Sequence, residues 1–70
     1  MKESEKLRVL IPHWIEHNEE HALEFKRWAE RAGQASPDLL AAVDLMNQVN
    51  PHLGIALENF GGALAHPHLH

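Results

Sequence analysis

The sequence predicts an all-α protein in which two helices form an antiparallel hairpin. Apolar residues recur at alternating steps of four and three residues along most of the chain, which is the spacing of one helix face. Only a short connection separates the two periodic stretches, and a short connection makes neighbouring helices antiparallel. No stretch of useful length shows the two-residue alternation of a β-strand.

The first helix is expected over about residues 4–32. Ser4 is its predicted N-cap, and Glu5 places negative charge in the first turn. Pro12 lies inside this range, where it removes one backbone hydrogen bond and crowds the carbonyl of Arg8. Either the helix continues through Pro12 with a kink, or Pro12 begins it; the unbroken spacing favours the first interpretation. The predicted inner face consists of Leu7, Ile11, Trp14, Asn18, His21, Phe25, Trp28 and Ala32.

The second helix is expected over about residues 37–60. Gly33 is a natural residue just beyond a helix end, Ser36 is the predicted N-cap, and Gly61 with Gly62 should end the helix. The predicted inner face consists of Leu39, Val43, Met46, Asn50, Leu53, Leu57, Phe60 and Leu64. The hairpin then occupies residues 1–62, and residues 63–70 form a His-rich tail that we expect to be flexible.

Folding the two faces together predicts a polar layer of Asn18, His21 and Asn50. In an antiparallel register His21 lies opposite Asn50, and Asn18 lies one layer away, facing Leu53. A buried polar group without a hydrogen bond costs about 1–3 kcal/mol, so His21 and Asn50 are expected to satisfy each other. Because the flank beside this layer is half apolar, we expect a homodimer or higher oligomer, with two hairpins forming a four-helix bundle.

Composition excludes several classes of function. The 70 residues carry a formal net charge of −4, with six Lys/Arg against ten Asp/Glu, so the chain is not expected to bind nucleic acid. No apolar run is long enough to span a bilayer, and no signal-peptide pattern is present. These features predict a cytoplasmic protein that does not bind membranes. Cysteine is absent and seven residues are histidine, which directs attention to imidazole chemistry.

Three histidines recur at every fourth residue in the predicted first helix. This spacing stacks side chains on one side of a helix, and imidazole with carboxylate suits Ni, Zn or Co, with Cu(II) or Fe also possible. A hydrogen-bonded polar layer or solvated histidines would give the same spacing. The predicted ligands are His13, His17, His21, Glu20 and Glu24.

A second group of histidines lies at the C-terminus. His66, His68 and His70 alternate with other residues, and short His-rich tracts are typical of metal binding. Nothing in the sequence orders this tract in advance, so we expect a weak and exchangeable site.

These patterns predict a small non-enzymatic metal-binding protein for storage, delivery or sensing of a transition metal, with a metal-acceptor protein as a possible partner. Catalysis by a nucleophile has little support, because the chain lacks cysteine and both serines are expected to cap helices. One alternative is a structural helical module that dimerises or binds a protein without metal. Another is a bundle that holds haem or two iron ions for redox or oxygen chemistry.

The run His13-Trp14-Ile15-Glu16-His17-Asn18-Glu19-Glu20-His21, continuing through Phe25 and Trp28, resembles a family of short, uncharacterised, His-rich helical proteins. This resemblance covers nearly the whole chain and implies no established activity. More loosely, His and Glu on two helices are similar to the hemerythrin-like and ferritin-like bundles. The Glu-x-x-His motif of ferritin-like di-iron proteins is missing, because Glu16, Glu20 and Glu24 are followed three residues later by Glu19, Leu23 and Arg27.

Overall fold

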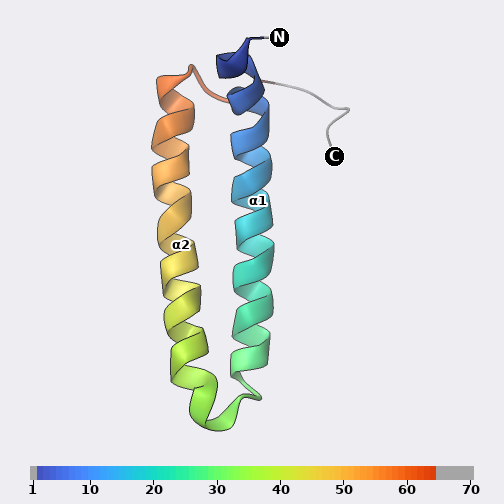
Figure 1. Ribbon diagram of the computed structural model, residues 1–70, viewed down its shortest axis with the longest axis vertical. Coiled ribbons are helices and arrows are strands. Elements are labelled where there is room, and N and C mark those ends of the chain that lie inside the picture. Colours follow the sequence, from blue (N-terminus) through green and yellow to red (C-terminus); the bar gives the residue numbers. More distant parts are fainter. Residues whose placement is uncertain (1, 65–70) are drawn as a thin grey trace.

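The computed structural model describes residues 2–64 and confirms the predicted hairpin. Helix α1 spans Glu3–Ala29, a short 3-10 turn η1 spans Gly33–Ala35, and helix α2 spans Ser36–Asn59. The two helices run side by side in opposite directions (Figure 1). The molecule measures 47 × 23 × 14 Å, so it is one helix thick. Neither helix combines the length and the apolar run that crossing a membrane needs.

The helix starts differ from the prediction. Ser4 lies inside α1, whose N-cap is Lys2; the Lys2 amide donates to Glu5 Oε1 at 3.3 Å. Ser36 is also helical and does not cap α2. Its backbone amide already donates to the carbonyl of Gly33, because the turn η1 runs directly into α2. At the start of α2, a continuous backbone turn therefore replaces the expected side-chain cap.

The end of α2 follows the prediction closely. Gly61 and Gly62 have φ angles of +101° and +88°, which glycine adopts without steric cost. The Gly62 amide donates to Leu57 O and the Gly61 amide to Glu58 O, both at 3.0 Å. This pair of bonds is the Schellman motif, which satisfies carbonyls that the helix end would leave unpaired. The chain consequently turns sharply after α2 and crosses to α1.

Helix α1 continues through Pro12, and α2 continues through Pro51. The interpretation in which Pro12 begins the first helix is therefore wrong. Proline lacks the amide that would bond the carbonyl four residues earlier, so the carbonyl of Arg8 has no partner within α1. That carbonyl instead accepts a hydrogen bond from the Leu64 amide at 3.3 Å.

The line of contact between the helices, here called the seam, is rotated on α1 relative to the prediction. Ala22 and Ala29 are 5% and 2% exposed, whereas Trp14 and Trp28 are 41% and 58% exposed. Small side chains allow two helix axes to approach, and the distance between axes depends on the residues at the contact. The two indoles therefore lie on the surface, and the two alanine methyl groups lie between the helices. The residues of the α1 seam are Arg8, Ile11, Ile15, Asn18, Ala22, Phe25 and Ala29.

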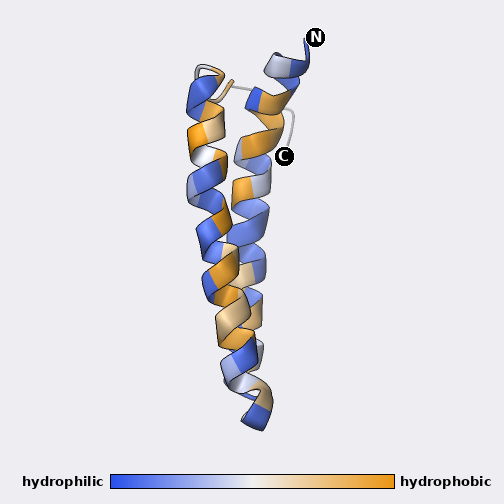
Figure 2. Ribbon diagram, turned by 60° about the vertical axis from the view of Figure 1, so that its left-hand side comes forward, coloured by the Kyte–Doolittle hydropathy of each residue, from blue (hydrophilic) through white to orange (hydrophobic). Residues whose placement is uncertain are grey.

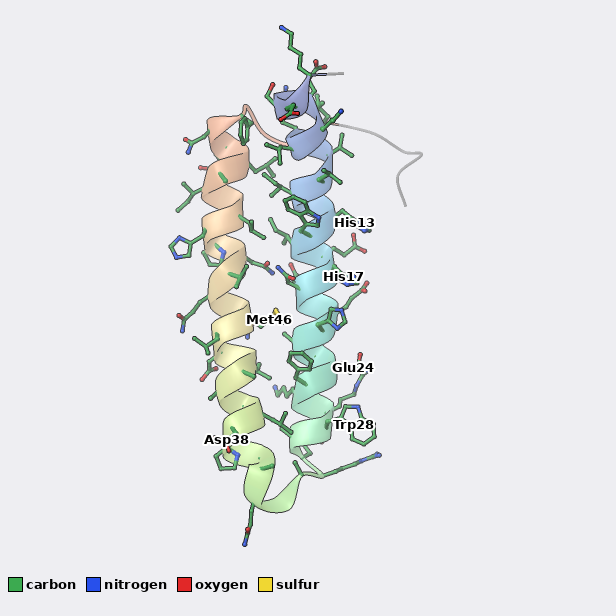
Figure 3. All side chains as sticks on the ribbon, in the orientation of Figure 1. His13, His17, Glu24, Trp28, Asp38 and Met46 are labelled. Atoms are coloured by element: carbon green, nitrogen blue, oxygen red, sulfur yellow. The ribbon has the colours of Figure 1, made fainter. Side chains whose placement is uncertain are left out.

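The seam of α2 is the predicted one for most of its length. Val43 is 8% exposed, and Met46, which points toward α1 in Figure 3, is half-buried. Phe60 departs from the prediction, since 38% of its surface is exposed. Hydrophobic and hydrophilic residues alternate along both helices (Figure 2), so apolar side chains also lie outside the seam.

The polar layer contains Asn18 and Asn50 but not His21. Asn18 Nδ2 donates to Asn50 Oδ1 at 3.1 Å, and Asn50 Nδ2 donates to the carbonyl of Ile15 at 3.2 Å. The expected pairing of His21 with Asn50 is thus wrong, and so is that of Asn18 with Leu53. The rotation of α1 places Ala22 in the seam and moves His21 to its edge.

Replacing Asn50 should test this layer. We expect Asn50→Ala to lower the free energy of unfolding by about 1–3 kcal/mol, because it leaves the half-buried Asn18 amide without its acceptor. Urea unfolding followed by circular dichroism measures the change. The matched control is Asn47→Ala, since Asn47 is exposed on the same helix. Equal effects of the two substitutions would contradict the assigned hydrogen bonds.

The rotated seam makes a second prediction. Ala29→Leu should lower the free energy of unfolding by about 1–3 kcal/mol, because the added side chain has no space between the helices. Arg27→Leu introduces the same side chain at an exposed position and should change stability by less than about 0.5 kcal/mol. Thermal unfolding of both variants gives the comparison. If Ala29→Leu is as stable as the wild-type protein, position 29 does not lie between the helices, and the seam through Trp28 that the sequence predicted is favoured.

Candidate metal centre

Three histidines and a phenylalanine form a row along one flank of α1. The ring centroids of His13 and His17 are 6.3 Å apart, those of His17 and His21 4.4 Å, and those of His21 and Phe25 6.1 Å. The fourfold spacing produces this row because residues four apart are neighbours on a helix. His13 and His17 are exposed, whereas His21 is half-buried.

His17 and His21 are in direct contact. Their Nε2 atoms are 2.9 Å apart, and the ring planes meet at 83°. In a hydrogen bond between them, one nitrogen donates and the other accepts, and the tautomers of the two rings decide which. Nε2 is one of the two ring nitrogens through which a neutral histidine binds a metal. The closest pair of predicted ligands therefore already has its Nε2 atoms side by side.

The other predicted ligands are not drawn into this contact. Figure 3 shows His13, His17 and Glu24 on the side of α1 that points away from α2. Glu20 and Glu24 are exposed. Among residues 2–64, no group of three or more His, Asp or Glu side chains lies close enough together to hold a metal ion. His66, His68 and His70 lie outside the described residues.

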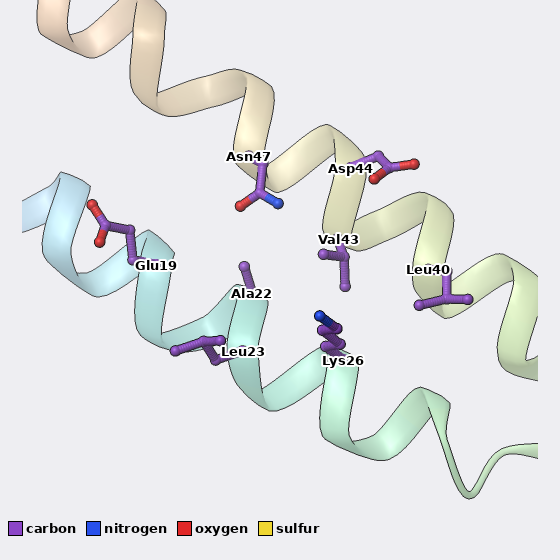
Figure 4. Close-up of a pocket in the computed structure, with 8 residues that line it drawn as sticks. All are labelled: Glu19, Ala22, Leu23, Lys26, Leu40, Val43, Asp44 and Asn47. Carbon is purple, nitrogen blue, oxygen red and sulfur yellow. The ribbon is translucent and has the colours of Figure 1, made fainter.

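An open groove lies on the opposite flank of the hairpin. Its volume is 590 Å³, and charged side chains stand beside aliphatic ones along both helices (Figure 4). No histidine lines it, so the groove is separate from the histidine row. The lining residues are Glu19, Ala22, Leu23, Lys26, Leu40, Val43, Asp44 and Asn47.

Comparison with known families adds one finding. A family described as Domain of unknown function (DUF8180) matches residues 7–60, which is most of the chain and includes most of both helices. The chain belongs to this family. No curated protein and no solved structure matches the chain at the significance we required. Membership in the DUF8180 family agrees with the predicted uncharacterised family, but it does not test the histidine motif.

The DUF8180 match covers His17, His21 and the Asn18–Asn50 pair, and it ends one residue before Gly61. Sequence reasoning missed one feature at that end, the contact between Arg8 and the segment after α2. Two signals were available: Arg8 is a charged residue beside apolar neighbours, and Pro12 leaves the Arg8 carbonyl unpaired within the helix.

Proposed function

We propose that this chain is a small non-enzymatic protein that binds a divalent transition metal at His17 and His21. The observation that carries the proposal is the 2.9 Å separation of the two Nε2 atoms. An ion held about 2.0–2.1 Å from each nitrogen separates them by about 2.9 Å at a right angle and about 3.4 Å at the tetrahedral angle. An ion bound to both nitrogens lies off the line that joins them, so it can bind after the two rings turn toward it while the nitrogens keep about their present separation.

The surroundings favour divalent cations with an affinity for imidazole. Glu16, Glu20 and Glu24 are exposed near the pair, and the chain carries a net charge of −4. Without cysteine there is no thiolate to select soft ions, so nickel, zinc and cobalt are the leading candidates, followed by Cu(II) and iron. Two protein ligands leave several coordination positions open, which suits uptake and transfer to an acceptor protein.

A second candidate function is dimerisation, supported by an apolar surface that we call the tryptophan face. The groove is lined by residues of both helices, so these residues mark one side of the hairpin. With 100° of rotation per residue, the exposed apolar residues of the tryptophan face lie on the opposite side of both helices, beside the histidine row. The tryptophan face consists of Leu10, Trp14, Trp28, Leu45, Val49 and Phe60, which are 38–64% exposed.

The shape of the hairpin supports a second copy of this chain as the occupant of the tryptophan face. The radius of gyration is 15.0 Å, against about 11 Å for a compact domain of this length. Only Ile11, Ala22, Ala29 and Val43 are buried hydrophobics among residues 2–64. Stacking two hairpins into a four-helix bundle would bury the indoles and supply the core that one layer lacks.

The metal-binding proposal predicts the effect of removing one imidazole. We expect wild-type protein to bind Ni(II) or Zn(II) with micromolar or lower Kd, and His17→Ala to weaken binding at least about tenfold, because half of the chelating pair is lost. Isothermal titration calorimetry measures both. His52→Ala is the matched control, since His52 is exposed on α2. Equal affinity of wild type and His17→Ala would refute the site.

The dimerisation proposal predicts the effect of a charge on the tryptophan face. Leu45→Asp should weaken self-association at least about tenfold, because a dimer would bury an unpaired carboxylate. Sedimentation velocity over a range of protein concentrations gives the result. Ile55→Asp is the control, because Ile55 is 57% exposed on α2 but lies off this face. A wild-type protein that stays monomeric at every concentration would rule out the second copy.

A further inference from the structure

His21 lies midway between the two tryptophans of α1. Trp14 is seven residues before His21 and Trp28 is seven residues after it, so each is about 10.5 Å from His21 along the helix axis. Seven residues are nearly two full turns, so the three side chains leave the helix in similar directions. Figure 3 shows His17 and Trp28 on the same side of α1. The histidine pair therefore lies at the middle of the part of the tryptophan face that α1 supplies.

A second copy packed on the tryptophan face is related to the first by a two-fold axis. In one of the two possible arrangements, α1 of each chain lies antiparallel on α1 of the other. With the axis at the level of His21, Trp14 of each chain meets Trp28 of the other, and paired aromatic rings attract each other beyond their burial. A residue beside a two-fold axis meets its own counterpart. The histidine pairs of the two chains are therefore brought together.

Helix α2 agrees with the same position of the axis. The hydrogen bond between Asn18 and Asn50 shows where the two helices are level, and three residues further along each helix His21 is level with Asn47. Val49, which is 42% exposed on the tryptophan face, is two residues from that level, or about 3 Å along the helix. Val49 of each chain therefore packs close to its own counterpart, and an apolar contact on α2 accompanies the histidines on α1.

We propose that a second copy of this chain completes the metal centre, with one ion on the two-fold axis bound by Nε2 of His17 and His21 from both chains. This inference rests on the proposed metal binding and names the partner that supplies the missing ligands. Within one chain the two Nε2 atoms are 2.9 Å apart, and among residues 2–64 no third His, Asp or Glu forms a metal-binding group with them. Four imidazoles complete the tetrahedral set of Zn(II) or the planar set of Ni(II) and Cu(II).

The exposure of the two imidazoles suits a site at the edge of a dimer interface. His21 is half-buried, whereas His17 is exposed further round the helix. A second copy covers His21 first, and His17 closes the site on the solvent side. Glu24 of the second copy is within one residue of the level of His17, where its carboxylate can accept a hydrogen bond from ring Nδ1. Such an acceptor orients a metal-binding histidine, which gives Glu24 a positioning role.

The interface is large enough to hold two copies together. The broad side of the hairpin measures 47 × 23 Å, which exceeds the area of about 800 Å² that each partner contributes to a standard interface. An ion that binds the dimer more tightly than the monomer strengthens association. By linkage, association strengthens binding of the ion by the same factor. The metal site and the dimer therefore depend on each other.

The test measures metal binding and self-association of the full-length chain. Calorimetry with Zn(II) should give one ion per two chains, and Zn(II) should lower the dimer dissociation constant at least about tenfold in sedimentation velocity. Leu45→Asp should weaken Zn(II) binding at least about tenfold, although Leu45 lies on α2 and is not a ligand. Leu45 is 64% exposed, so this variant stays folded, which circular dichroism verifies. Ile55→Asp, the control, should leave affinity and stoichiometry unchanged.

The outcomes separate the shared ion from the metal site itself. Equal Zn(II) affinity of wild type and His17→Ala refutes metal binding at the pair. If His17→Ala weakens binding but Leu45→Asp does not, the shared ion is overturned and each chain keeps a two-histidine site. One ion per chain also overturns it; the second two-fold arrangement, with α1 on α2 of the other copy, gives this result because it holds the histidine pairs apart. A dimer that forms equally well with and without Zn(II) overturns it too.

Discussion

The burial of Ala22 and Ala29 between the helices decides which side of α1 faces α2. With methyl groups at these points, the helices contact along a narrow line, and the indoles of Trp14 and Trp28 have no room between them. The rotation that follows moves His21 from the middle of the seam to its edge. There it contacts His17 instead of Asn50, so the candidate centre is accessible from solvent.

The hairpin itself could be predicted from the sequence, because periodicity, the short connection and the terminal glycines are local signals. The seam of α2 was predictable for the same reason, since Leu39, Val43 and Met46 are large apolar residues that recur at helical spacing on one face of α2. On α1 a large apolar residue precedes a smaller one twice, as Trp14-Ile15 and Trp28-Ala29. A prediction from hydrophobicity alone places the tryptophan between the helices. Close packing of the two helices instead favours the smaller neighbour at that position.

The candidate centre was predictable only as a set of residues. Fourfold spacing places the three histidines in one row, and the structure contains that row. Spacing does not determine that His17 and His21 converge while His13 stays apart, because that choice depends on side-chain rotamers and on the rotation of the helix. The pairing of Asn18 with Asn50 differs by about one helical turn from the expected register, because several registers bury similar apolar residues. The Arg8 contact, between residues 54 positions apart, was missed because a side chain reaches two backbone carbonyls, and hydrophobic spacing does not encode such a contact.

That separation has a consequence for how the chain folds and opens. Arg8 and Gly62 close a loop that contains nearly the whole molecule, as a disulfide would in a chain with cysteine. Such a contact forms late, because the entropy of closing a long loop must be overcome after the local helices exist. Only three hydrogen bonds hold it, two of them donated by the Arg8 side chain. Residues 62–64 can therefore detach from Arg8 and rebind while both helices stay folded.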